Sequence, residues 1–305
     1  MKAATQLLCR FLPRQSRGWV IAGPYLWFLV FFLVPFVVVL KISLSTAEVA
    51  IPPYAPLFTI GDEGTLNLAM HFGNFAYIFS DPQYILAYLS SLHYAAGTAI
   101  ITLMIGYPVA YAIATSKPNV RPMLLMLVIM PFWTSFLIRV YAWIGILKQN
   151  GLINNFLMSI GVIHEPLNIL NNQFSIYVGM VYAYLPFMIL PLYSNLEKMD
   201  HSLLEAASDL GAKPFRAFLS ITLPLSLPGI VAGSLLVFIP AVGEYIIPTL
   251  LGGADTLTIG TVLWNEFFGN RDWPVASTVA VALIVLLVGP LMLLQHYQAK
   301  EGEKA

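Results

Sequence analysis

An acidic residue, Glu244, lies inside a long apolar stretch of this 305-residue chain, just after Pro240 and Gly243. A carboxylate in a membrane-length apolar segment has to face protein or a water-filled cavity, because lipid does not solvate charge. If the segment enters a membrane near Leu225, a rise of about 1.5 Å per residue places Glu244 about 25–30 Å along it. A carboxylate at that depth can bind a cation.

A basic residue, Arg139, lies in a second apolar stretch, about 24 Å along from Met123 by the same rise. Two interpretations of Glu244 follow. Glu244 forms an ion pair with Arg139 that holds two membrane segments together, or it receives the ammonium group of an organic cation. The two interpretations do not exclude each other.

Aromatic residues accompany these charges along the same stretches. Their faces bind alkylammonium groups, but Tyr and Trp also pack and anchor membrane helices. Each ring by itself therefore indicates either role. The candidate substrate path comprises Glu244, Tyr245, Trp133, Arg139, Tyr141 and Tyr184, with Trp143 and Tyr182 as further rings.

A charged segment, residues 197–224, has the pattern of a helical hairpin. Asp200 can cap a first helix, Gly211 supplies the left-handed residue that ends it, and Pro214 suits the first turn of a second. Small residues, Ala206 and Ala207, leave its surface shallow enough for a partner to dock. The apolar stripe of the hairpin is Leu203, Leu204, Ala207, Leu210, Phe215, Phe218 and Leu219. An ordinary amphipathic loop lying on the membrane is the alternative.

The composition requires a membrane to position these residues. The chain is 58% hydrophobic and 10% charged, with a mean hydropathy of +0.78, whereas a soluble domain is about half apolar and a quarter charged. A bilayer is crossed by about 20 apolar residues. We therefore expect an all-α integral membrane protein with six transmembrane helices, at residues 19–40, 88–115, 123–147, 174–193, 225–250 and 274–295.

The expected organisation is an N-terminal tail (1–18), a six-span domain (19–296) that contains the loop 197–224, and a C-terminal tail (297–305). The first span is too long for the apolar part of a signal peptide, and no clear cleavage site follows it. Polar segments at 43–84, 148–172 and 252–272 connect the spans. The first of them includes a short interfacial helix near residues 66–79.

Basic residues set the expected orientation. Eleven of the fifteen Lys and Arg residues fall on one side, in residues 1–17, 117–121, 198–216 and 300–304. Lys41, Arg139, Lys148 and Arg271 remain for the other side. Both termini and the hairpin are therefore expected in the cytoplasm.

Several chemistries have no supporting motif. No phosphate-binding Gly-x-x-x-x-Gly-Lys-Ser/Thr loop is present, so the chain is not expected to hydrolyse ATP. The five His residues lack metal-ligand spacing, and Cys9 is the only cysteine. No catalytic residue, metal, bound cofactor or nucleic-acid partner is expected, and His93 is interpreted as a hydrogen-bonded core residue.

The hairpin also carries a spaced pattern: Glu-Ala-Ala, three residues, Gly, nine residues, Ile, one residue, Leu-Pro. It is met by Glu205, Ala206, Ala207, Gly211, Ile221, Leu223 and Pro224. The pattern resembles the cytoplasmic coupling loop of permease subunits in binding-protein-dependent ATP-binding cassette (ABC) importers. The expected ATPase-coupling residues are these seven and Asp209.

Longer blocks look like the polyamine permeases, closest to the putrescine type. They are PFWTSFLIRVYAWIGIL at 131–147, VYAYLPFMILPLY at 181–193, VFIPAVGEYIIPTLLGG at 237–253 and NRDWPVAS at 270–277. The resemblance extends from about residue 25 onward, and spermidine permeases share much of it.

This resemblance implies a type I importer permease in a bacterial inner membrane. The implied partners are a dimer of ATP-binding cassette ATPases that uses ATP and Mg, a second permease subunit, a periplasmic polyamine-binding protein and membrane lipid. Spermidine, an amino acid derivative or ferric ion are alternative solutes. A channel is the alternative from another class, and it would need no coupling hairpin.

Overall fold

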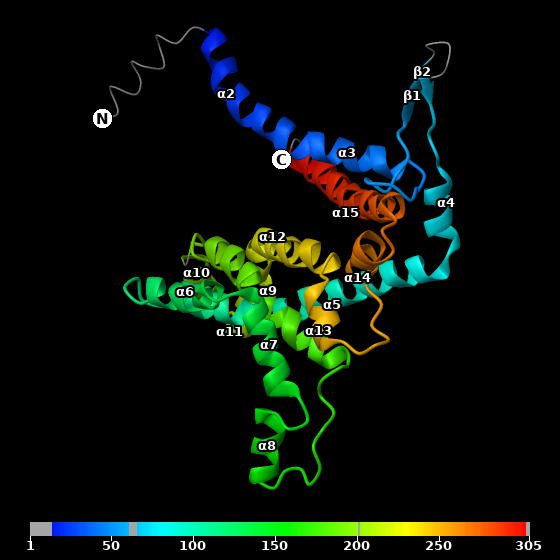
Figure 1. The fold of residues 1–305 in the computed structure, drawn as a ribbon. Helices are drawn as coiled ribbons and strands as arrows, with labels where there is room; N and C mark the ends of the chain where they lie inside the picture. The colour runs from blue at the N-terminus through cyan, green and yellow to red at the C-terminus, as the bar shows by residue number, and fades with distance from the viewer. Residues whose placement is uncertain (1–13, 61–65, 201, 303–305) are drawn as a thin grey trace. The chain divides into compact units, whose positions relative to one another are not determined.

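The computed structural model describes residues 14–60, 66–200 and 202–302. The described chain is mostly helical and contains one two-stranded β-hairpin (Figure 1). It divides into two compact units, residues 82–264 and residues 1–81 with 265–305.

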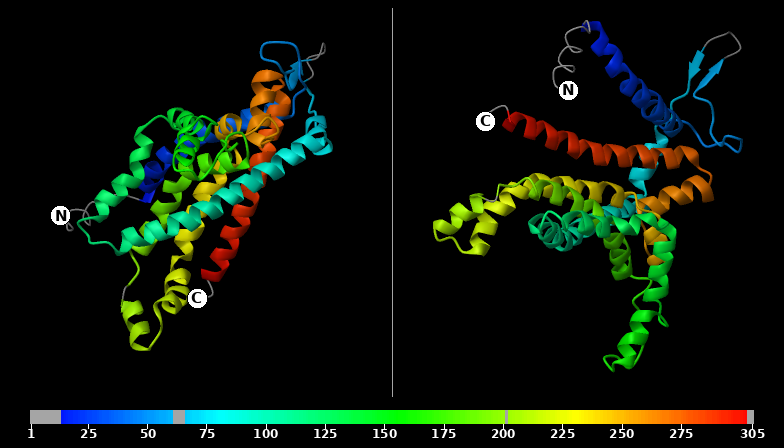
Figure 2. Two further views of the ribbon diagram at one scale, coloured as in Figure 1. Left: turned by 90° about the horizontal axis from the view of Figure 1, so that it is seen from below. Right: turned by 90° about the vertical axis from the view of Figure 1, so that its left-hand side faces the viewer.

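Three long helices form the centre of the larger unit and pack against one another (Figures 1 and 2): α5 (Pro82–Thr115), α9 (Gln173–Leu196) and α12 (Leu223–Val242). Glycines let them approach closely. A Cβ atom at Gly106 of α5 would lie 3.1 Å from Met188 Cγ of α9, and one at Gly233 of α12 would lie 2.8 Å from Met188 Sδ. Such small-residue contacts bring helices together in lipid, where van der Waals packing supplies much of the attraction.

The third expected span is not one straight helix. It is divided into α6 (Arg121–Ile129), the 3₁₀ turn η2 (Met130–Trp133) and α7 (Phe136–Leu147), and α8 (Leu152–Ser159) follows. The part up to Trp133 and the part from Phe136 to Ser159 are bent by 89°. Pro131 lies in the turn before the break, where its missing N–H interrupts the helical hydrogen bonds.

The fifth expected span, 225–250, begins earlier and is also broken. Its helix starts in the hairpin as α11 (Pro214–Ala217), continues through the π-turn η3 (Phe218–Thr222) into α12, and ends at Val242. A second piece, α13 (Ile246–Leu251), follows residues 243–245. The second helix of the hairpin is therefore continuous with the span, and Glu244 lies at a helix break.

The smaller unit contains α2 (Arg14–Phe28), the π-turn η1 (Leu29–Leu33), α3 (Val34–Ser43), β1 (Phe58–Ile60), β2 (Leu66–Leu68), α4 (Gly73–Ser80), the π-turn η4 (Asn265–Gly269) and α15 (Trp273–Gly302). α15 packs on α3 and α4. The backbone oxygen of Ser43 accepts hydrogen bonds from Asn74 Nδ2 (3.0 Å) and Thr278 Oγ1 (3.2 Å), which ties the end of α3 to both neighbours.

The structure corrects two sequence predictions in this unit. The interfacial helix expected at residues 66–79 is the strand β2 followed by α4, so only its second half is helical. Helices also extend into the expected tails, because α2 begins at Arg14 and α15 continues to Gly302. The remaining tail residues lie outside the described part.

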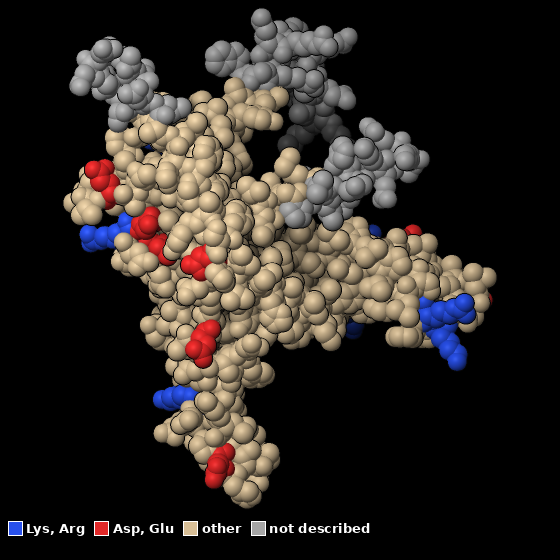
Figure 3. Space-filling model, turned by 90° about the vertical axis from the view of Figure 1, so that its right-hand side faces the viewer, with Lys and Arg blue, Asp and Glu red and all other residues tan. Residues whose placement is uncertain are grey.

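Long apolar helices confirm a membrane protein. Four described helices are long and apolar enough to cross a membrane, and the bent pair makes a fifth if it is counted as one span. The sixth expected span corresponds to α15, whose apolar part Trp273–Gly289 is shorter. Figure 3 shows a face that is mostly uncharged, with Lys, Arg, Asp and Glu gathered in a few places.

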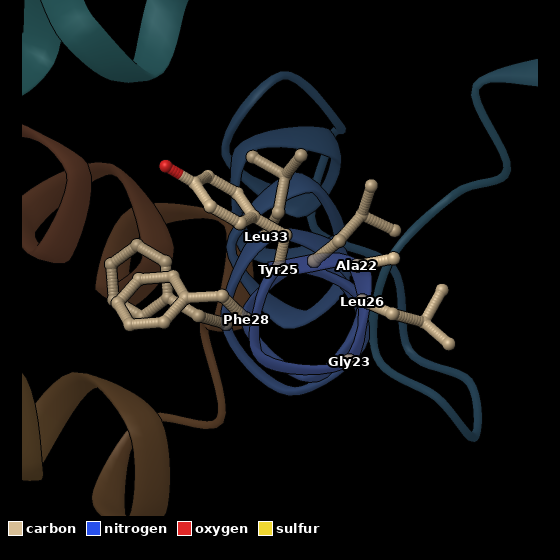
Figure 4. Close-up of a pocket in the computed structure, with 8 residues that line it drawn as sticks. Ala22, Gly23, Tyr25, Leu26, Phe28 and Leu33 are labelled. Carbon is tan, nitrogen blue, oxygen red and sulfur yellow. The ribbon is translucent and has the colours of Figure 1, made fainter. Parts of the chain in front are cut away.

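The first span is the most exposed of the four long apolar helices. The most apolar 18-residue window of Ile21–Ser43 has a mean hydropathy of 2.5, and only 6% of that window is buried. An apolar hollow of about 930 Å³ runs along it, lined by side chains that include Tyr25, Phe28 and Leu33 (Figure 4). Lipid or a partner subunit is expected to cover this surface, since contiguous exposed apolar side chains mark membrane or protein contacts.

Candidate functional site

Glu244 lies between the two helical pieces of the fifth span. Its Oε1 accepts hydrogen bonds from the backbone N–H groups of Ile246 (3.0 Å) and Ile247 (3.4 Å). These groups begin α13, so the carboxylate caps that helix and is favoured by its dipole. The other piece, α12, ends at Val242 and is followed by Gly243, whose φ of −87° is ordinary. The Glu244 side chain therefore satisfies the first backbone N–H groups of α13 at the break.

The second oxygen of this carboxylate has a partner on another helix. Tyr184 of α9, which is 7% exposed, donates its hydroxyl to Glu244 Oε2 at 2.5 Å. A hydroxyl that donates to an ionised carboxylate forms a short, strong hydrogen bond. Of the predicted substrate path, the structure thus brings Tyr184 and Glu244 together.

Both pieces of the broken span are fixed to α9. A Cβ atom at Gly229 of α12 would lie 2.8 Å from Asn195 Cβ, so α12 packs closely there. At the other end, Leu251 O of α13 accepts hydrogen bonds from Ser175 Oγ (2.6 Å) and Asn171 N (3.1 Å). The position of the Glu244 carboxylate is consequently set by rigid elements on either side.

Arg139 does not pair with Glu244, so the ion-pair interpretation is wrong in this structure. Arg121 instead forms an ion pair with Glu197, at 3.3 Å. The Arg139 guanidinium lies over the rings of Phe132 (5.2 Å) and Phe136 (5.6 Å), and its buried Nε has no hydrogen-bond partner. The sequence argument assumed a straight span, and the bend after Trp133 invalidates its depth estimate.

The predicted aromatic residues separate into two groups. Trp133 and Tyr141 are 69% and 59% exposed, so they face outward from this chain. Tyr245, next to Glu244, stacks on Trp264 with ring centroids 4.5 Å apart and an interplanar angle of 14°. Trp143 and Tyr182 contact each other edge to face at 5.5 Å.

Sequence reasoning missed Trp264 and Gly260. Both lie on the short helix α14 (Ile259–Trp264), inside a segment expected to be a polar loop. A six-residue helix has too few apolar positions to show a period. Gly260 was the available signal, because a glycine within an element often marks a close backbone approach.

The coupling hairpin folds as its sequence predicts. The first helix, α10 (Ser202–Asp209), follows Asp200, whose Oδ1 accepts from Ser202 N at 3.0 Å. Gly211 has a φ of +79° and ends the helix in a Schellman motif, with Ala212 N bonded to Ala207 O and Gly211 N to Ser208 O. The second helix begins at Pro214.

The outer surface of this hairpin is available for docking. Leu210 is 89% exposed, Phe215 74% and Leu203 44%, and Glu205 and Ala206 are exposed beside them. On the inner side, Phe218 lies edge-on to Tyr107 (5.6 Å) and Tyr111 of α5. The hairpin is thus held to the helical core and presents an apolar patch outward.

An apolar bundle with a polar break in one span and an exposed hairpin before that span is the architecture of a transport permease. Residues 84–300 match the family of the binding-protein-dependent transport system inner membrane component, and the chain belongs to this family. A chain of a bacterial alginate ABC transporter, solved in complex with an alginate pentasaccharide-bound periplasmic protein, has the same fold. It is 17% identical, with a TM-score of 0.67 over 92% of this chain and 94% of that one.

Individual relatives are more similar. The chain is 41% identical to the spermidine/putrescine transport system permease protein PotB of Haemophilus influenzae, over 90% of this chain and 91% of the relative. It is 43% identical to the protein of the same name from Escherichia coli, over 72% of this chain and 79% of the relative. The protein is therefore an inner-membrane ABC importer permease.

Proposed function

We propose that this chain is the permease subunit of an ATP-driven importer that carries polyamines, putrescine foremost, from the periplasm to the cytoplasm. The names of the PotB relatives and their 38–43% identity support the polyamine class. Spermidine is the alternative substrate, since those names include both. Both are flexible organic cations, which bind to carboxylates and aromatic faces.

The observation that carries the proposal is the Glu244 carboxylate at a helix break. Discontinuous membrane helices place polar backbone groups and charges beside a transport path. Here the break carries the Glu244 carboxylate and the ring of Tyr245, and Tyr184 of α9 donates its hydroxyl to the carboxylate. An ammonium group can replace or share the hydrogen bond from Tyr184, so the site exchanges one donor for another.

Partner subunits would supply the energy and the substrate. In this proposal two ATPase subunits bind ATP and Mg, and the patch at Leu203, Leu210 and Phe215 docks in a groove of one of them. Their closure on ATP moves the hairpin and favours an outward-open state, because the contacts differ between the two states. A second permease completes the path, and a periplasmic binding protein delivers the polyamine.

Transport by the complete complex tests the substrate class. The permease is assembled with its ATPase, second permease and binding protein in proteoliposomes, and uptake of labelled putrescine is measured with and without ATP. Unlabelled spermidine, an amino acid derivative and ferric citrate compete in parallel. We expect ATP-dependent uptake inhibited by polyamines alone, whereas flux without ATP would indicate a channel.

The Glu244→Gln variant tests the site. Gln keeps the size of the side chain and an oxygen that can cap α13, so the substitution removes charge with little change in packing. We expect the number of putrescine molecules transported per ATP hydrolysed to fall about tenfold, the loss expected for about one charge-assisted hydrogen bond. An unchanged ratio would exclude Glu244 from substrate binding.

A further inference from the structure

The short helix α14 lies directly against the helix break that carries Glu244. A Cβ atom added at Gly260 would lie 2.6 Å from Glu244 O and 2.8 Å from Gly243 O. Both obstacles are backbone atoms, so no side-chain rotation relieves the clash. Glycine is therefore required for α14 to sit where it does.

A second contact lies one helical turn further along α14. Trp264 follows Gly260 by four residues, so the two share a face of the helix. The Trp264 ring stacks on Tyr245, the residue next to Glu244, at 4.5 Å between centroids. The same face of α14 thus contacts the backbone of the break and its flanking side chain.

The start of α14 is anchored elsewhere in the unit. The backbone N–H of Ile259 donates to Ser91 Oγ of α5 at 2.8 Å, and both residues are buried, at 0% and 1% exposure. Thr258 Oγ1 lies 2.8 Å from Thr261 Oγ1 within the same turn. α14 consequently links α5 to the break as a fixed brace.

We infer that α14 is a positioning element of the substrate site, in which Gly260 and Trp264 set the position of the Glu244 carboxylate and the space beside it. This inference rests on the proposed role of Glu244 in binding an ammonium group. Gly260 fixes how near α14 comes to the break. Trp264 stacks on the ring of Tyr245, the residue that follows Glu244, and so holds the chain next to the carboxylate in place.

Substitutions in α14 test this role in the assembled complex. Gly260→Ala forces α14 and the break apart, and Trp264→Leu removes the stacked ring. We expect each to lower the putrescine transported per ATP hydrolysed about fivefold. This is less than the loss of about tenfold expected when one hydrogen bond to a charged group is removed. Trp264→Phe keeps a ring at that position and should restore most of the ratio.

A glycine elsewhere in the same unit provides the control. Gly145 lies in α7, and a Cβ atom there meets no atom within 4 Å. Gly145→Ala should therefore keep the wild-type ratio. A variant that merely folds poorly loses transport and ATP hydrolysis together, which leaves the ratio unchanged.

The double variant Gly260→Ala with Glu244→Gln distinguishes the two proposals. If α14 acts through the carboxylate, the double variant should be no worse than Glu244→Gln alone, because the effects are coupled. A wild-type ratio in Glu244→Gln would overturn the role of Glu244 and this inference with it. If Glu244→Gln has a low ratio, two results would overturn the role of α14 alone. One is a wild-type ratio in Gly260→Ala and Trp264→Leu, and the other is additive losses in the double variant.

Discussion

The Glu244 carboxylate does two things at once, because each of its oxygens has a different partner. Oε1 caps α13 through Ile246 N, and Oε2 accepts from Tyr184. The first contact is local and holds the break in shape. In the role proposed for Glu244 the second is exchangeable, since a phenol can give way to a substrate ammonium without leaving the carboxylate unpartnered.

Arg139 should act independently of Glu244. Its guanidinium lies over Phe132 and Phe136, which flank the bend at residues 134–135, and each cation–π contact stabilises by about 0.5–1 kcal/mol. Arg139→Gln therefore loosens the bend and should lower uptake moderately. In the double variant with Glu244→Gln we expect the two losses to add.

Uptake of labelled putrescine by both single variants and the double variant, at matched expression, provides the measurement. Arg139→Lys is the control, since it keeps the charge near the rings. Recovery of uptake in the double variant would mean that the two residues form an ion pair in some state of the transporter, and would contradict the arrangement described here.

At the scale of elements, the turn at Gly211 fixes the shape of the hairpin and of its proposed docking surface. Its φ of +79° is unfavourable for a residue with a side chain by about 1–2 kcal/mol, and more for a β-branched one. Gly211→Val should leave membrane insertion intact and abolish both uptake and substrate-stimulated ATP hydrolysis, because the hairpin no longer presents Leu210 and Phe215 together.

Gly161 offers a matched control for that substitution. It has a φ of +73°, and a Cβ atom there meets nothing within 4 Å, but it follows α8 and lies outside the hairpin. Gly161→Val introduces similar strain and should retain coupling. Normal transport in Gly211→Val would remove the hairpin turn from the mechanism.

Pro224, the last residue of the coupling pattern, explains the π-turn where the hairpin joins its span. Leu223 N bonds to Phe218 O, five residues back, and Pro224 follows at once. The same arrangement occurs at Val34 and Leu29, just before Pro35. A proline lacks the N–H and clashes with the carbonyl four residues earlier, and the wider turn relieves this clash.

Pro224→Ala should therefore let the turn relax to an α-helix. A π-turn contains about one residue more than an α-helical turn, so this relaxation rotates the hairpin by about 100° relative to α12. The proposed docking surface then faces another direction. Uptake and stimulated ATP hydrolysis should fall together, whereas Pro35→Ala, with the same local change in another span, should retain coupling. Equal effects of the two variants on coupling would contradict this explanation.

The sequence predicts elements better than it predicts their interruptions. Apolar length located the spans, and Asp200, Gly211 and Pro214 located the hairpin, because these signals are local. Proline alone did not locate the breaks: Pro108 and Pro186 lie within continuous helices, while Pro131 precedes a sharp bend. The break at Glu244 has a local signal in Pro240 and Gly243, but its contacts with Tyr184 and Gly260 join residues that are distant in sequence and could not be predicted from local patterns.

At the scale of the whole molecule, contacts within the larger unit join segments that the predicted orientation places on the same side of the membrane. The ion pair between Arg121 and Glu197 joins two segments expected in the cytoplasm. The bonds from Asn171 and Ser175 to Leu251 O, and from Ile259 to Ser91, join segments expected outside or the outer ends of expected spans. Which end faces the cytoplasm remains a prediction from the basic residues.

Cysteine labelling in whole cells tests that orientation. In a Cys9→Ser background, single cysteines replace Asn119 or Ser220 on the predicted inner side, and Asn155 or Asp255 on the outer side. All four positions are exposed in this chain, so differences in burial should not decide their reactivity. An impermeant thiol reagent should label cysteines at 155 and 255 and spare those at 119 and 220, because eleven of the fifteen basic residues keep the latter side inside. Permeabilised cells should label all four, and the reverse pattern in intact cells would place the hairpin away from ATP and refute its docking to an ATPase.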